Sequence, residues 1–350
     1  MPYQIRKFIF SIFPLQNPRS LYMNAESQNN IVIFDVATSN DKSIAKTQQL
    51  YLSKATADNT RRTYQAAIRQ FEAAGGLLPA TEQDLILYIT TKAPILNPRT
   101  LSLHLTAISH WHCYQQLPDP TQTVQIRKLL KGIFRSHGKP KRKAKALHPK
   151  HIEKMVTYLQ QQNNLKALRD NALIQLAYFG AFRRSELIAI TVEHLRFETQ
   201  GLLVLVPRSK TDQEGEGKIK ALPYGNNNIC PVQAVKLWLE AANINQGFIF
   251  RAINRWNNLQ PEPLNLNSVN KIIKTLANKC RFDFVADLSS HSLRRGFATS
   301  AANAGTDFEW IKRQGGWKND ATVREYIEEG QLFDKNAAAK LITFAFNNKE

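Results

Sequence analysis

The sequence has little of what several classes of protein depend on. Its 350 residues include only three cysteines, Cys113, Cys230 and Cys280, and these are far apart. An odd number of cysteines at such spacings indicates neither a disulfide framework nor a zinc site, and it favours a reducing compartment, the cytoplasm. No run of apolar residues approaches the roughly 18 that a membrane span requires. The composition is that of a folded globular protein.

Acidic residues are also scarce relative to basic ones. The chain has 28 Asp and Glu against 47 Lys and Arg, which gives a formal net charge of +19. Such a balance favours a partner rich in phosphate, with nucleic acid first and an anionic membrane surface second. The sequence contains no Walker-type glycine loop and no carboxylate cluster typical of a metal site. These absences are consistent with a protein that uses neither a cofactor nor a metal.

Hydrophobic periodicity divides the chain into parts. Residues 1–41 show little periodicity, and we expect them to be poorly ordered. Segments such as "TRRTYQAAIRQFEAAGG" then repeat apolar residues at helical spacing, whereas "HGKPKRKAKALHPKH" is basic, contains proline and has nothing to bury. The predicted parts are an N-terminal extension (1–41), a helical domain (42–137), a basic linker (138–149), a second domain (150–330) and a C-terminal tail (331–350).

The second domain combines long helical patterns with one clear β signal. "LLVLVP" and "KIKALPY" predict two strands, and the polar segment "RSKTDQEGEG" between them predicts a hairpin turn that exposes Lys210. Lys218 and Lys220 in the same hairpin are alternatives to Lys210. The predicted fold is mainly α, with a small antiparallel β-sheet, in two domains.

Two short motifs place arginines beside other polar groups. In "GAFRRSEL", Arg183 and Glu186 share one face if the segment is helical, so the carboxylate can orient the guanidinium. A surface ion pair worth a few tenths of a kcal/mol is the alternative interpretation. In "SSHSLRRGFAT", a serine can cap a helix on which His291 and Arg294 share a face. Two guanidiniums suit a phosphate because each is permanently charged and donates paired hydrogen bonds.

The segment near the C-terminus supplies two aromatic residues. "GTDFEWIKRQGG" predicts a helix capped by Thr306 and ended by its glycine pair, which fixes Trp317 just beyond it. "NDATVREYI" predicts a further short helix that carries Tyr326. A tyrosine phenol can act as a nucleophile toward phosphate, although a lone tyrosine is more often a packed aromatic. His291 and Lys210 are candidates for proton transfer.

Taken in order, these residues resemble the active site of the tyrosine recombinases, also called phage integrases. "FRRSEL", "HSLRRGFAT" and "GGWKNDATVREYI" are similar to three motifs of that family, and the resemblance extends over about residues 42–350. The family pattern selects Arg183 rather than Arg184, and Arg294 rather than Arg295. Many members carry a histidine where this chain has Trp317, a tryptophan shared with the Cre recombinase.

The resemblance implies a two-domain clamp around duplex DNA and cleavage through a 3′-phosphotyrosyl intermediate formed by Tyr326. Because that intermediate retains the bond energy, the resemblance also implies that neither a metal nor a nucleotide cofactor is required. It implies a homotetramer acting on two duplexes that carry a specific site, accessory DNA-bending proteins, and a protein associated with the nucleoid when bound to DNA. The tail would dock on a neighbouring protomer, or alternatively pack on its own domain. The candidate site residues that the resemblance and the charge pattern supply are Tyr326, Arg183, Arg294, His291, Lys210 and Trp317, with Glu186 in support, and for DNA contact Lys139, Lys141, Arg142, Lys143, Lys145, Arg61 and Arg62.

Three other functions remain open on the sequence. A type IB topoisomerase or a telomere-resolving enzyme would use the same chemistry, and a DNA-binding regulator would keep the residues without the activity. The compact size and the Cre-like terminal motif favour a recombinase over the first two. The intact set of six catalytic-type residues argues against the regulator.

Overall fold

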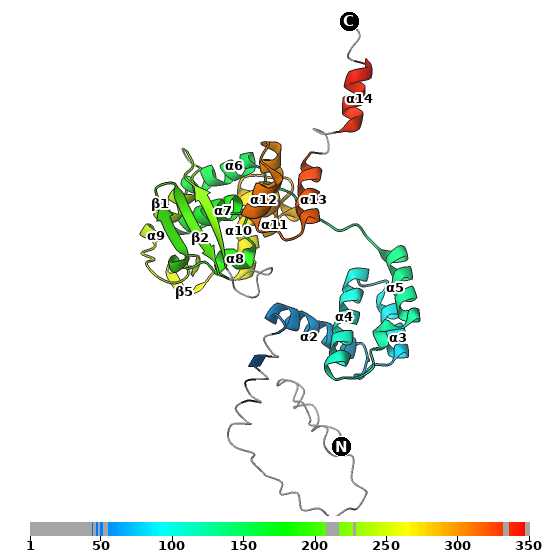
Figure 1. Ribbon diagram of the computed structural model, residues 1–350. Coiled ribbons are helices and arrows are strands. Elements are labelled where there is room, and N and C mark those ends of the chain that lie inside the picture. Colours follow the sequence, from blue (N-terminus) through cyan, green and yellow to red (C-terminus); the bar gives the residue numbers. More distant parts are fainter. Residues whose placement is uncertain are drawn as a thin grey trace, which may run out of the picture. The chain divides into compact units, whose positions relative to one another are not determined.

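The computed structural model describes residues 44, 47, 50–51, 55–207, 217–226, 229–331 and 336–346. The predicted extension 1–41 lies outside these residues. The chain separates into two compact units, Met1–Lys141 and Arg142–Glu350, and each is described by itself (Figure 1). Within the described residues, no helix combines the length and the apolar content that crossing a membrane requires.

The first unit is helical. Its helices are α2 (Asp58–Ala73), α3 (Glu82–Lys92), α4 (Pro98–Tyr114), a 3-10 turn (Pro120–Gln122) and α5 (Val124–His137). Side chains cap three of the α-helices, since Thr81, Asn97 and Thr123 each accept a backbone N–H of the first turn. α2 packs on α4, while α3 and α4 both pack on α5, around a core that includes the fully buried Phe71 and Ile108.

The second unit surrounds a larger core with helices. They are α6 (Pro149–Gln160), α7 (Leu165–Phe179), α8 (Arg184–Ile188), α9 (Pro231–Ala241), α10 (Leu266–Lys279), α11 (Ser290–Asn303), α12 (Phe308–Gly315), α13 (Asp320–Gly330) and α14 (Ala337–Phe346), with 3-10 turns at Val192–His194 and Val285–Asp287. α7 lies at the centre and packs against α6, α9 and α11. Nearly all of the residues of α7 from Ala167 to Tyr178 are buried, so this helix forms the core of the unit.

Two small antiparallel sheets complete the second unit. The predicted hairpin is β2 (Gly201–Val206) and β3 (Lys218–Pro223), and β1 (Leu195–Glu198) adds to it in the order β1-β2-β3. Val204 lies opposite Lys220 in the β2–β3 register. β4 (Arg251–Ile253) and β5 (Leu259–Pro263) form the second pair, which the sequence pattern did not predict.

Helix starts near the C-terminal end follow local side chains. Ser289 caps α11 and Asn319 caps α13, whereas the sequence pattern leaves Ser290 and Asp320 as alternative caps. α12 differs, because Asp307 rather than Thr306 is its cap: the Asp307 carboxylate accepts the backbone N–H of Glu309 at 2.8 Å. A carboxylate is a better N-cap than a hydroxyl one residue earlier, since it also complements the helix dipole.

Part of the predicted basic linker is packed on the second unit. The backbone N–H of Lys145 donates to the carbonyl of Asp287, and that of Leu147 donates to Ser292, both at 3.1 Å. Leu147 is fully buried, so the expectation that this segment has nothing to bury is wrong at that residue. A Cβ on Gly296 of α11 would lie 1.9 Å from the Leu147 carbonyl oxygen, and the absence of a side chain there allows this approach.

Candidate active site

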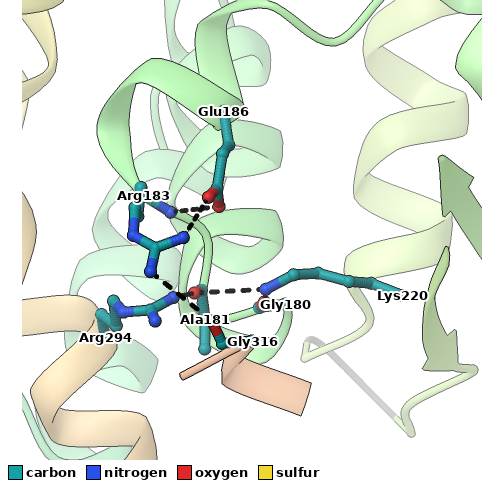
Figure 2. A network of polar contacts seen from close by, with 7 residues as sticks. All are labelled: Gly180, Ala181, Arg183, Glu186, Lys220, Arg294 and Gly316. Atoms are coloured by element: carbon teal, nitrogen blue, oxygen red, sulfur yellow. Dashed lines mark hydrogen bonds and ion pairs between the residues drawn. The ribbon is translucent and has the colours of Figure 1, made fainter. Parts of the chain in front are cut away.

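A tight turn at the end of α7 forms the floor of the site. Gly180 is the C-cap of α7, and Ala181, which is fully buried, has a positive φ of 44°. Left-handed backbone is uncommon for residues other than glycine, so other groups must hold this conformation. Lys220 and Arg294 donate to the carbonyl oxygens of Gly180 and Ala181, and Arg183 follows two residues after Ala181 (Figure 2). Gln314 of α12 donates to the Phe179 carbonyl of the same turn.

Arg183 is held by a buried carboxylate. Its Nη1 donates to Glu186 Oε1 at 2.6 Å, and its backbone N–H donates to Glu186 Oε2 at 2.9 Å. Arg183 occupies the N-cap of α8 in extended conformation, so the two residues do not share a helical face as the spacing suggested. The side chain of Glu186 is only 3% exposed, whereas that of Arg183 is 19% exposed, so this is not a surface ion pair. The pair fixes the guanidinium at the edge of the site.

Arg294 comes from α11 and is almost entirely buried. Its Nη1 donates to the Ala181 carbonyl, and its guanidinium lies over the Trp317 ring at 4.0 Å from the centroid. Its Nη2 is buried and has no hydrogen-bond partner among the described residues. Burial and then the charge of Arg183 lower the pKa of Arg294 to about 10, so it remains a cation at neutral pH. Arg294 is therefore a buried cation whose Nη2 can still donate a hydrogen bond.

Trp317 is positioned by the two glycines before it. Gly316 ends α12 in the left-handed conformation, with φ 65°. A Cβ on Gly315 would lie 1.7 Å from the Trp317 ring, so the indole occupies space that any side chain at 315 would fill. Trp317 is 8% exposed and packs with Ala181 and Ile311. The carbonyl of Gly316 accepts Arg183 Nη2 at 3.5 Å.

Tyr326 lies on α13 against the same small core. Its ring meets that of Trp317 edge to face, at 6.1 Å between centroids, and lies 5.4 Å from the Arg295 guanidinium carbon. Thr299 Oγ1 of α11 donates to the Tyr326 carbonyl at 2.9 Å. The phenol is close enough to Arg294 that its charge would raise the pKa of that arginine. The structure therefore brings together Arg183, Arg294, Trp317 and Tyr326.

The two proton-transfer candidates are placed differently. His291 is exposed in the first turn of α11, three residues before Arg294, and its backbone N–H donates to Ser289 Oγ at 3.2 Å. Lys210 lies outside the described residues.

Among the residues that are described, no group of His, Cys, Asp and Glu side chains is arranged to hold a metal ion.

Lys220 of β3 lies in the site, against the turn after α7. Its Nζ donates to the Gly180 carbonyl at 2.6 Å and to the Ala181 carbonyl at 3.4 Å (Figure 2). The same Nζ lies 4.6 Å from the centroid of the Phe182 ring. Burial, followed by the charge of Arg294, lowers the pKa of Lys220 to about 7. The sequence named this lysine as an alternative, but gave no sign that it is buried.

The candidates for DNA contact lie on exposed or half-exposed surface. Several have acidic partners: Arg142 Nη2 lies 2.6 Å from Asp287 and Lys143 Nζ lies 2.6 Å from Glu325. The candidates are Arg61 and Arg62 on α2, and Lys139, Lys141, Arg142, Lys143 and Lys145 after α5.

Comparison with known proteins decides the family. Residues 145–331 match the sequence profile of the phage integrase family. The chain is 34% identical over 322 residues to an integrase/recombinase xerD homolog of Selenomonas ruminantium, an alignment that covers 89% of this chain and 94% of that protein. The chain belongs to the phage integrase family. It is accordingly a tyrosine recombinase, an enzyme that breaks and rejoins DNA strands.

More distant phage integrase relatives share the fold. Tyrosine recombinase XerA of Pyrococcus horikoshii is 23% identical over 288 residues, covering 81% of this chain and 88% of that protein. The crystal structure of a lambda integrase dimer bound to a COC' core site aligns with a TM-score of 0.58 at 14% identity, over 82% of this chain and 76% of that one. The predicted fold class, mainly α with a small antiparallel sheet, is confirmed.

Proposed function

We propose that this phage integrase cleaves and rejoins duplex DNA at a specific site, with Tyr326 as the nucleophile. The phenol oxygen attacks a backbone phosphorus, the bond from phosphorus to the 5′ oxygen breaks, and the 3′ end remains joined to the tyrosine. The phenol loses a proton and the departing 5′ oxygen gains one. A 5′ hydroxyl of a second strand then reverses the step, so no external energy source is required.

The observation that carries the proposal is the unpaired donor of Arg294. The guanidinium of Arg294 is buried, and its Nη2 has no hydrogen-bond partner among the described residues. A buried donor without a partner costs free energy, and a bound anion that accepts its hydrogen bond would remove that cost. The Trp317 ring lies against the Arg294 guanidinium, and Arg183 donates to the carbonyl of the preceding residue, Gly316. Tyr326 packs on the Trp317 ring. Two cations beside a tyrosine suit a phosphate whose negative charge grows in the transition state.

The residues take complementary roles in this proposal. Arg183, oriented by Glu186, and Arg294 hold the nonbridging oxygens of the phosphate. Trp317 offers one indole N–H and cannot transfer a proton near neutral pH, so it only donates a hydrogen bond. His291 and Lys210 transfer the protons of the attacking and departing oxygens.

Binding is proposed to involve both units. The net charge of +19 supports a DNA partner, since cations along the backbone release counterions. The helical domain 42–137, the basic linker 138–149 and the catalytic domain 150–330 would each contact the duplex. Arg142 and Lys143 would exchange their carboxylate partners for phosphates when DNA binds.

Assembly is proposed as a homotetramer on two duplexes, with accessory DNA-bending proteins at some sites. The tail 331–350 supports this, because Leu341, Ile342 and Phe344 of α14 are exposed apolar residues. Such residues suit docking on a neighbouring protomer.

The test is the covalent intermediate. Full-length protein is incubated with fragmented genomic DNA of its host, and the mixture is then denatured with detergent. The DNA fragments that remain covalently bound to protein are isolated and sequenced. Wild type should yield adducts at a specific sequence, and Tyr326→Phe should yield none because it lacks the nucleophilic oxygen. Tyr224→Phe, at an exposed tyrosine elsewhere in the second unit, is the control and should behave as wild type.

Persistence of adducts in Tyr326→Phe would exclude Tyr326 as the nucleophile. The mapped sequence then serves as a defined substrate. Recombined products support the proposal, whereas products that are only relaxed or hairpin-ended would indicate a topoisomerase or a telomere-resolving enzyme.

A further inference from the structure

The turn after α7 is held by side chains from three separate elements. Gln314 of α12, Lys220 of β3 and Arg294 of α11 all donate to its main chain. The acceptors are the carbonyl oxygens of Phe179, Gly180 and Ala181. Since each element contributes a donor, the backbone of this turn is fixed relative to β3, α11 and α12 together.

Lys220 is the cation at the centre of these contacts. It is 5% exposed, which is unusual for a lysine, because a buried ammonium loses its hydration. The carbonyls at the end of α7 carry partial negative charge, and the Phe182 ring adds a cation–π contact. These contacts compensate in part for the hydration that the buried ammonium loses.

The turn connects directly to both arginines of the site. The Ala181 carbonyl is a shared acceptor, since both Lys220 Nζ and Arg294 Nη1 donate to it. Ala181 also has the left-handed backbone that requires outside support, and Arg183 lies two residues further along the chain. A shift of the turn would therefore move the anchor of one arginine and the main chain of the other.

We propose that Lys220 is a positioning residue of the strand-cleavage reaction: it holds the Gly180–Ala181 turn so that Arg183 and Arg294 grip the same phosphate. The inference rests on the proposed function of the site. Lys220 Nζ faces main-chain carbonyls, and this assigns it to holding the turn rather than to proton transfer, which stays with Lys210.

The first experiment compares two lysines of one strand. Lys220→Met removes the ammonium but keeps an unbranched side chain, and Lys218→Met makes the same change at an exposed position of β3. Full-length proteins are assayed for DNA binding, thermal unfolding and single-turnover adduct formation on the mapped substrate. We expect Lys220→Met to form adducts roughly 10- to 100-fold more slowly with DNA binding retained, since a small misplacement of catalytic groups has such effects. Lys218→Met should react at the wild-type rate.

The second experiment uses pH to separate positioning from stability. The charged groups that act on Lys220 are Arg294, Arg183, Glu186 and Lys218. Because burial lowers the pKa of Lys220 to about 7, its charge is lost across the neutral range. A neutral amine still donates, but its hydrogen bonds to the two carbonyls are weaker than those of an ammonium. The ratio of the wild-type adduct rate to that of Lys220→Met should therefore fall as pH rises. A residue that served stability alone would leave this ratio constant.

Lys220→Arg keeps a charged donor at every pH and should recover most of the rate. Should Lys220→Met not fold, Lys220→Arg decides, because its rate relative to wild type should rise with pH. A folded Lys220→Met that matches wild type at every pH would overturn the positioning role and leave the proposed function intact. Failure of wild type itself to form Tyr326 adducts would instead overturn the proposed function.

Discussion

At the scale of single residues, the two arginines of the site are held in different ways. Arg183 is fixed by the Glu186 carboxylate and retains 19% exposure, whereas Arg294 is fixed by a main-chain carbonyl and is buried. A carboxylate neutralises most of the charge of its partner, but a carbonyl does not. Arg294 therefore provides the stronger field for an incoming anion, and Arg183 the more rigid geometry.

Replacement of either arginine should reduce cleavage far more than binding. We expect Arg294→Ala and Arg183→Lys each to lower the single-turnover rate of adduct formation by about 10² to 10³, the range for loss of one transition-state donor. Lysine at 183 keeps a cation beside the buried carboxylate, which would otherwise be left unpaired. Electrophoretic mobility shift and adduct assays on the same protein preparations measure the two effects.

Arg184→Ala is the matched control for Arg183, since it removes a neighbouring guanidinium outside this network. It should react within about twofold of wild type, as surface changes generally do. Equal losses in Arg184→Ala and Arg183→Lys would show that general positive charge, rather than the Arg183 geometry, supports the reaction.

The family resemblance, rather than residue spacing alone, named the members of the candidate site, and neither of them gave the contacts between these residues. Arg183, Arg294, Trp317 and Tyr326 do come together, but the pairing of Arg183 with Glu186 is a helix cap and not a helical face. Lys220 could not be distinguished from Lys218 by pattern, because both lie on one face of an alternating strand. Only the packing of β3 against the turn after α7 buries one and exposes the other.

At the scale of elements, the glycine pair between α12 and α13 determines where the indole can lie. Gly315→Ala should push the Trp317 ring away, because a Cβ would lie 1.7 Å from it. Since that ring contacts both Arg294 and Tyr326, adduct formation should fall. Overpacking of this kind should also lower the free energy of unfolding by about 1–3 kcal/mol. Thermal unfolding and single-turnover kinetics test both parts.

The control for this substitution is Gly132→Ala in α5, where a Cβ meets no atom within 4 Å. There the change should be neutral or stabilising by up to about 1 kcal/mol, because alanine favours helix. If Gly315→Ala also proves harmless, the indole has room to move and its position does not depend on that glycine.

Element ends were predictable where side chains determine them, and short strands were not. Ser289 and Asn319 cap the helices that carry Arg294 and Tyr326, and both are visible in the sequence. β4 has three residues and β5 reads "LQPEP", with two prolines, so neither shows the alternation that predicts a strand. Their pairing arises from the surrounding core and not from local preference.

At the scale of the whole molecule, charge and length indicated a DNA-associated protein of more than one domain. The division of the chain at Lys141/Arg142 falls within the basic segment, yet residues 145–147 pack on the second unit. Composition could not show this, since the backbone hydrogen bonds to Asp287 and Ser292 carry no sequence signal. The structure divides the chain into two units at Lys141/Arg142. The separate roles of the helical domain, the linker and the catalytic domain in DNA binding are part of the proposed function.

The bond from Thr299 to the main chain of Tyr326 has a genetic consequence. It fastens α13, which carries Tyr326, to α11, which carries Arg294, so one polypeptide supplies every described member of the candidate site. Two inactive alleles, Tyr326→Phe and Arg294→Ala, should then fail to complement each other when coexpressed or mixed in vitro. Adducts formed by the mixture would mean that the tyrosine crosses to a neighbouring copy. If the alleles fail to complement, a copy that carries an inactivating mutation cannot be rescued by the residues of a neighbouring copy.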